Sequence, residues 1–246
     1  GTSRGLFFHK KDLPPEPEER NRIFLHGLDA YNPSQVNGLG SGTSHTSKAV
    51  VISPSEWEGV DVDYTFYQIG IGEEIVDDTG TCGNLMAAVG PFAVDEGLVS
   101  VDPAQEAAVV HVYNTNIGKN IRLTVPVVNG KARVSGDYRM PGLVKPGAKI
   151  VVDLLQPGGG KTGKTLPLGA LYSVSTERKA YTVSFVDVVN PFVFLAGHDL
   201  GLSGTEPLGE LAANGLLLAE MNKIRDLMTV AAGMAESEQE AKTRSQ

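Results

Sequence analysis

Cysteine and tryptophan each occur only once in this chain of 246 residues. The single cysteine, Cys82, excludes an internal disulfide framework and is typical of a reducing compartment, so we expect a cytoplasmic protein. The five histidines lack the short spacings of a zinc site, so we expect no metal. No apolar run approaches the roughly 20 residues that span a bilayer, so we also expect no membrane segment.

Positive charge is scarce as well, with 21 lysines and arginines against 29 aspartates and glutamates and a net charge of -8. A nucleic acid or an anionic membrane surface would require a basic patch that neutralises phosphates. We therefore expect neither as a partner, and a small molecule instead. An initiator Met is absent too, so we expect the N-terminus to be missing, which leaves organelle targeting by an upstream segment open.

The lone cysteine stands immediately before an apolar segment. Residues 84–98 contain almost no polar side chain, which predicts a helix that is buried on all sides. The N–H groups and the positive dipole end at the start of such a helix attract the carboxylate of a ligand. Cys82 is therefore a candidate for chemistry, and a small buried structural cysteine is the alternative.

Short strands are predicted on both sides of this helix. Alternation within 61–71 places Val62, Tyr64, Phe66 and Gln68 on one face, and the pair Asn129-Gly130 is typical of a hairpin turn. An antiparallel sheet wrapped round the helix buries it on every face, so we expect an α+β fold. The other predicted strands are 6–8, 49–53, 107–114, 120–128 and 149–155.

Two loops are rich in small and hydroxyl residues. The first, residues 1–5, offers hydroxyls and backbone N–H groups that can bind an anion. The second occupies residues 38–47 and ends at Lys48, immediately before a predicted strand. A lysine in that place is a second candidate for chemistry, and an ordinary surface lysine is the alternative.

Residues 158–165 match the phosphate-binding pattern of nucleoside triphosphatases residue for residue. That loop must open a helix, whereas Pro167 and Gly169 stand here where the first helical turns would form. A flexible linker between domains is therefore the favoured interpretation. A nucleotide-binding loop from Gly158 to Thr165 is the less favoured alternative.

A second domain is predicted from residue 175. Residues 1–174 then form the first domain, and 175–246 form the start of a second domain that is incomplete. In the first domain, a helix at 18–28 is expected to bury Ile23, Phe24 and Leu28. In the second, strands at 181–189 and 192–197 precede a helix that begins at Glu206 or Pro207 and carries an apolar series, namely Leu208, Leu211, Leu216, Leu217, Met221, Ile224 and Leu227.

Seven stretches can be compared together with known proteins: Gly1-Thr2-Ser3-Arg4-Gly5, Thr46-Ser47-Lys48, Asp61-Val62-Asp63-Tyr64-Thr65-Phe66, Cys82-Gly83-Asn84, Tyr113-Asn114-Thr115-Asn116, Leu166-Pro167-Leu168-Gly169 and Gly201-Leu202-Ser203-Gly204-Thr205-Glu206. In this order the chain resembles the PrpF family of methylaconitate isomerases, aconitate and methylitaconate delta-isomerases and oxalomesaconate tautomerases. The resemblance implies a diaminopimelate epimerase-like fold, in which two similar domains each wrap a sheet round a central helix. It also implies a chain truncated at both ends, since family members continue beyond Gln246.

By matching positions, the resemblance implies that Lys48 and Cys82 are the acid/base pair. It assigns carboxylate binding to Thr2 and Ser3 and to the helix start at Gly83 and Asn84. Thr81 stands where the family usually has Asn, a departure that can alter contacts with the substrate. No cofactor and no metal are implied, and a homodimer is one option for the assembly.

The implied activity is that of a cofactor-independent isomerase. It would catalyse a 1,3 proton shift in an unsaturated tricarboxylate such as aconitate or methylaconitate, by double-bond migration or cis/trans isomerisation. The site must supply a base, an acid and donors aimed at the developing dienolate, and we expect Ser3, Arg4 and Ser47 to help hold the carboxylates. The alternatives are an inactive truncated relative that binds di- or tricarboxylates and, less favoured, the nucleotide binder.

Overall fold

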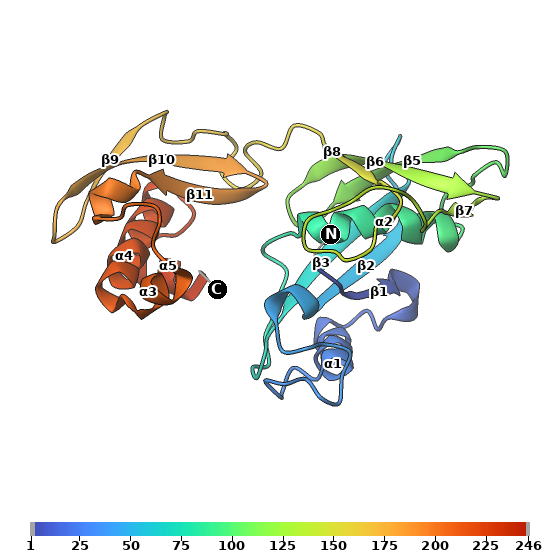
Figure 1. Cartoon of the computed structure of the whole chain (residues 1–246), viewed down its shortest axis with the longest axis horizontal. Helices are drawn as coiled ribbons and strands as arrows, with labels where there is room; N and C mark the ends of the chain where they lie inside the picture. Colours follow the sequence, from blue (N-terminus) through green and yellow to red (C-terminus); the bar gives the residue numbers. More distant parts are fainter. Residues whose placement is uncertain (1–2, 245–246) are drawn as a thin grey trace. The chain divides into compact units, whose positions relative to one another are not determined.

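The computed structural model describes residues 3–244, which form two compact units divided between Gln156 and Pro157 (Figure 1). The sequence placed the start of the second domain at residue 175. The boundary lies earlier because residues upstream of 175 already bond to the second unit. The N–H of Gly159 donates to Asp187 O, and strand β9 (Tyr172–Ser175) pairs with β10 (Ala180–Val188).

The first unit is built on an eight-stranded sheet in which most neighbouring strands are antiparallel. The pairs β1·β2 and β3·β5 are parallel. Across the sheet the strands follow the order β1 (Leu6–His9), β2 (Lys48–Pro54), β3 (Val62–Ile69), β5 (Ala107–Asn114), β6 (Lys119–Val128) and β7 (Lys131–Ala132), while β4 (Val76–Asp77) pairs with β3 and β8 (Val151–Leu154) pairs with β6.

The sheet passes around helix α2 (Gly83–Asp95), with β1 to β3 on one side and β5, β6 and β8 on the other (Figure 1). The interior residues of α2 are buried or half-buried, and the buried ones are Leu85, Met86, Val89, Gly90, Ala93 and Val94. The fit is tight, because a Cβ added at Gly90 would lie 2.5 Å from Val125 Cγ2. The predicted α+β fold, with a sheet wrapped round a central helix near 84–98, is confirmed.

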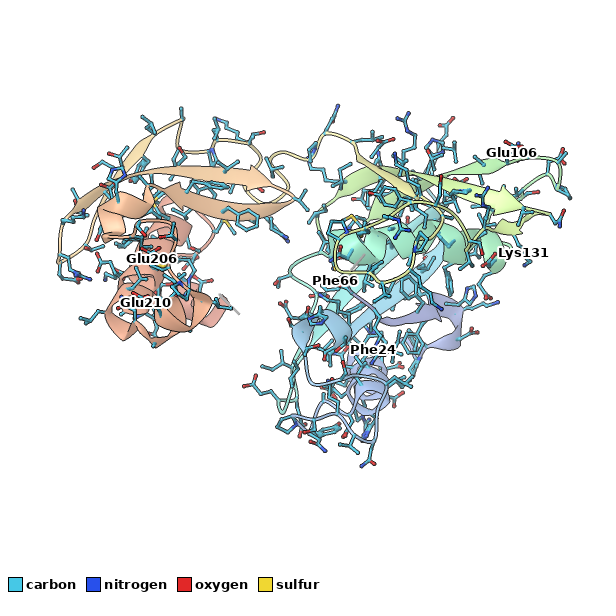
Figure 2. All side chains as sticks on the ribbon, viewed as in Figure 1. Phe24, Phe66, Glu106, Lys131, Glu206 and Glu210 are labelled. Carbon is cyan, nitrogen blue, oxygen red and sulfur yellow. The ribbon has the colours of Figure 1, made fainter. Side chains whose placement is uncertain are left out.

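The outer face of β2 and β3 is covered by helix α1 (Pro17–Leu28). Phe24 belongs to the cluster on this face, and Phe66 belongs to the cluster around α2; both are labelled in Figure 2. The prediction that Ile23 is buried was wrong, since it is 37% exposed and Leu25 takes its place in the core. Residues 24, 25 and 28 form a single helical face that excludes position 23.

Helix α2 runs in the same direction as the parallel strands β1 and β2. At its start, Leu85 Cδ1 lies 3.0 Å from the position that a Cβ of Gly5 would occupy, immediately before β1. At its end, Glu96 Oε2 lies 3.0 Å from Nε2 of His9, the last residue of β1. The starts of α2, β1 and β2 therefore lie at one end of the unit, which carries both predicted proton-transfer residues.

The turn between β6 and β7 is the predicted hairpin. Asn129 has a φ of 52° and Gly130 a φ of 75°, and a two-residue type I′ turn requires positive φ at both positions. Within the described residues there are also three short 3₁₀ helices: Lys10–Asp12, Ser44–Thr46 and Gly197–Leu200.

The second unit contains a three-stranded antiparallel sheet in the order β11 (Asn190–Leu195), β10, β9. Helix α4 (Gly215–Ala231) packs on one face of it through Ile224 and Met228, and α3 (Leu208–Ala213) and α5 (Glu238–Arg244) flank α4. The prediction of one continuous helix from 206 or 207 was wrong. The helix breaks at Asn214, whose Oδ1 accepts from Leu217 N at 3.0 Å and so begins α4 anew.

Residues 158–165 do not open a helix, so the segment lacks the geometry that nucleotide binding requires. Its backbone instead surrounds a carboxylate of its own unit. Oδ2 of Asp187 accepts from Lys161 N at 2.9 Å, from Thr162 N at 2.7 Å and from Thr162 Oγ1 at 2.8 Å.

Within residues 3–244, no helix is long and apolar enough to cross a bilayer.

Candidate active site

Lys48 is the first residue of β2 and is 8% exposed. Because side chains alternate along a strand, it shares the face of Val50 and Ile52, which pack in the cluster around α2. Its Nζ donates to Gln68 Oε1 at 2.8 Å and lies 5.0 Å from the centre of the Phe66 ring. The alternative interpretation, that Lys48 is an ordinary surface lysine, is therefore wrong.

Cys82 is the residue that precedes the first turn of α2, and it is 9% exposed. Its side chain makes no capping hydrogen bond to the helix. Its carbonyl oxygen accepts from Met86 N at 3.1 Å and from Tyr64 Oη at 3.5 Å. Two hydrogen bonds to its carbonyl oxygen thus fix the backbone of Cys82.

Tyr64 supports Cys82 as a neutral hydrogen-bond donor. Burial raises the pKa of Tyr64 well above its ordinary value, and a hydrogen bond with Thr81 opposes this in part. The phenol therefore keeps its proton at neutral pH, which suits a role in holding the Cys82 carbonyl.

The residues flanking Cys82 are held by side chains from other elements. Thr81 Oγ1 accepts from Nδ2 of the fully buried Asn114 at 2.7 Å. Asn116 donates through Nδ2 to Asp78 O at 2.8 Å and to Phe66 O at 2.9 Å, which ties the loop before Cys82 to β3. These bonds come from the end of β5 and the turn that follows it, so the position of the cysteine depends on the register of the sheet.

The predicted carboxylate-binding residues are distributed around the start of α2. Asn84 Nδ2 donates to Ser3 Oγ at 3.2 Å, which joins the opening loop to the helix. Gly83 is exposed, and a Cβ there would meet no atom within 4 Å, so space is open in front of the first turn. Arg4 is exposed and its backbone N donates to His45 O at 3.0 Å. Thr2, the remaining member of the opening loop, lies outside the described residues.

Ser47 differs from these residues because its side chain is fully buried. Its Oγ lies 2.9 Å from both Gln35 Oε1 and Thr43 O, which are hydrogen-bond acceptors. These bonds hold the hydroxyl-rich loop together immediately before Lys48. Contact between Ser47 and a substrate stays a prediction.

The opening loop joins the two candidate proton-transfer regions. A Cβ at Gly5 would lie 2.7 Å from Lys48 O and 3.0 Å from Leu85 Cδ1, so glycine allows β1 to enter between β2 and the first turn of α2. An amine, a thiol and the amide end of a helix therefore share one end of the unit. Such a set can exchange protons with a bound acid and stabilise its negative charge.

Sequence reasoning missed the polar residues that support this site, above all Gln35 and Gln68. A signal for Gln68 was present, since it ends the otherwise apolar face of β3 formed by Val62, Tyr64 and Phe66. Gln35 stands in a polar loop and carries no such signal.

Within the described part of the chain, no group of three or more histidine, cysteine or acidic residues could hold a metal ion.

Comparison with known proteins gives one family and a consistent set of relatives. The family model described as PrpF protein matches residues 1–246. The 3-methylitaconate isomerase of Eubacterium barkeri is 40% identical, over 100% of this chain and 64% of its own length. The 2-methyl-aconitate isomerase of Shewanella oneidensis is 33% identical, over 99% of this chain and 65% of its own length.

Among solved structures, a methylitaconate-delta-isomerase is similar with a TM-score of 0.79 and 39% identity. The match covers 100% of this chain and 63% of that one. The chain thus spans less than two thirds of the length of each of these relatives.

Proposed function

We propose, because the chain belongs to the PrpF family, that it acts as a cofactor-independent isomerase of unsaturated carboxylic acids. The observation that carries the proposal is the shared location of Lys48 and Cys82 at the end of the unit where α2, β1 and β2 begin. The relatives named as isomerases of methylitaconate and methylaconitate support this substrate class. Aconitate and methylaconitate, both unsaturated tricarboxylates, are the first candidates.

The proposed reaction is a 1,3 proton shift. One member of the Lys48–Cys82 pair removes a proton from the carbon next to the double bond, and the electrons spread into a dienolate conjugated with a carboxylate. The other member delivers a proton to the third carbon, so the double bond migrates and no net redox change occurs. Both groups act as general acid and base, which is typically worth a factor of 10² to 10⁴ in rate.

The start of α2 is the proposed carboxylate subsite. Its first-turn amides and positive dipole end favour a negative charge, and the open space in front of Gly83 leaves room for one. The Ser3 hydroxyl and the Asn84 amide, which are bonded to each other, would contact the same carboxylate in this proposal. Arg4, exposed beside them, adds a positive charge near this end of the unit.

The test is solvent exchange. The protein is incubated with aconitate or methylaconitate in D2O, and NMR follows deuterium entering the acid. Lys48→Ala and Cys82→Ala should each lower the exchange rate by about 10² to 10⁴. Lys164→Ala, in the loop around Asp187, should leave it unchanged. Absence of exchange with every acid would refute the isomerase, and a carboxylate-dependent thermal shift without exchange would instead indicate a binding protein.

A further inference from the structure

Gln68 makes the shortest polar contact of Lys48. The two residues are directly opposite each other in the antiparallel pair β2·β3, and Lys48 Nζ lies 2.8 Å from Gln68 Oε1. The amine also lies over the Phe66 ring, 5.0 Å from its centre. No ion pair among residues 3–244 involves Lys48, so its described polar environment is set by one neutral side chain.

The orientation of the Gln68 amide follows from its other contacts. Nε2 donates to Ser44 O at 3.0 Å and to Ser47 O at 2.9 Å. Carbonyl oxygens only accept hydrogen bonds, so the NH₂ group must face them and the oxygen must face Lys48. The same two bonds join Gln68 to the loop that precedes Lys48, so one amide contacts both this loop and the Lys48 amine.

The neutrality of the amide matters for a group that gains and loses a proton. An amide oxygen accepts a hydrogen bond from an amine in either protonation state. A carboxylate in the same place would favour the ammonium form and so bias the amine against releasing its proton. The site thus uses an acceptor that directs the amine without holding its charge.

We propose that Gln68 is a positioning residue that holds the Lys48 amine in place for proton transfer. The inference rests on the proposed isomerase function for its consequence in catalysis, but the positioning itself is independent of activity. Gln68 acts through Lys48 and is assigned no contact with the substrate.

The first experiment measures the amine directly. Wild type and variants of the whole chain are trace-labelled with acetic anhydride across a pH series, and mass spectrometry quantifies acetylation of the peptide that contains Lys48. Gln68→Glu should move the pH of half-maximal labelling upward by about one unit or more, because the new carboxylate favours the ammonium form. Gln105→Glu, which adds the same charge at an exposed position, should leave that pH unchanged.

The second experiment measures deuterium exchange into the acid. Gln68→Leu removes the acceptor at similar size and should lower kcat by about 10²-fold, as expected for a misplaced catalytic group, with little change in KM. Gln35→Asn is the matched control, because Gln35 supports the same loop through Ser47 and Gly42 and does not bond to Lys48. It should not reproduce the fall in kcat.

The outcomes separate the two proposals. An unchanged labelling profile in Gln68→Glu would overturn the positioning role, whatever the activity, because a carboxylate in contact with the amine must favour the ammonium form. Equal kinetic losses in Gln68→Leu and Gln35→Asn would also overturn it, because loop support alone would then explain the effect. A wild-type protein without exchange would refute the isomerase, while the labelling profile would still decide the role of Gln68.

Discussion

Each unit packs one main helix against a sheet, but the two helices differ in how much of their surface is covered. The buried positions of α2 are all apolar or glycine, and the sheet surrounds it. Helix α4 contacts a sheet of three strands and leaves apolar side chains in solvent, with Leu216 77% and Met221 43% exposed. Enclosure by a sheet, rather than helix composition alone, therefore decides how completely a helix is buried.

The two helices also begin differently. Asn214 caps α4 with its own side chain, as is usual at a helix start. Cys82 precedes α2 and provides no such bond. Asparagine and serine at this position stabilise a helix, so the use of cysteine gives up stability at the point where the first unit carries its candidate site. The start of α4 is therefore capped by its own side chain, whereas the start of α2 carries the proposed proton-transfer residue instead.

The largest expected difference concerns burial. Met86→Ala in α2 removes a fully buried side chain and should lower the free energy of unfolding of the first unit by about 2–5 kcal/mol. Leu216→Ala in α4 should change stability by less than about 0.5 kcal/mol. Urea unfolding followed by the fluorescence of Trp57 reports on the first unit, and hydrogen exchange of α4 peptides reports on the second. Similar losses in both variants would contradict the contrast in enclosure.

A smaller difference is expected at the helix starts. Asn214→Ala should destabilise the second unit by about 1 kcal/mol through loss of its cap. Cys82→Ser introduces a preferred capping residue of similar size, so it should keep or raise the stability of the first unit while solvent exchange into the acid falls. Hydrogen exchange of the first turns of α2 and α4 measures both effects. A Cys82→Ser variant that loses stability would show that the thiol serves packing instead.

The smallest effect concerns acid. Glu220 accepts one hydrogen bond from Thr176 and one from Tyr181. The bond from Thr176 has the larger effect, and together the two bonds lower the pKa of Glu220 below its ordinary value of 4.5, although burial opposes them. A lowered folded-state pKa means that the carboxylate stabilises the second unit above about pH 4.5 and that this contribution is lost as the pH falls through the folded-state value.

Glu220→Gln should therefore flatten the pH dependence of the stability of the second unit below pH 4.5, measured as hydrogen exchange of α4 peptides at several acidic pH values. Trp57 fluorescence in the same samples follows the first unit, which should respond identically in variant and wild type. An unaltered acid profile of α4 would mean that other carboxylates control it.

Much of the first unit could be predicted because its signals are local. An almost wholly apolar run of this length favours a buried helix, alternation sets the faces of β3, and Asn129-Gly130 favours the I′ turn. The errors arose where neighbouring structure decides between similar local options. Ile23 and Leu25 are both apolar, and only the position of the sheet selects one of them for the core. Asn214 is tolerated within a helix or at its start, and the packing of α4 selects the start.

By itself, the sequence determined which chemical groups are present and where their elements begin: a lone thiol before an apolar helix and a lysine at the first position of a strand. Only the tertiary structure placed Gln68 against Lys48, Ser3 against Asn84, and Asn116 across the loop before Cys82. Lys48 and Gln68 are 20 positions apart in the sequence, and Ser3 and Asn84 are 81 positions apart. Asn116 is 38 positions from Asp78, its partner in the loop before Cys82. They meet because of strand order and register, which depend on the packing of the whole sheet around α2 and are not encoded in any local stretch.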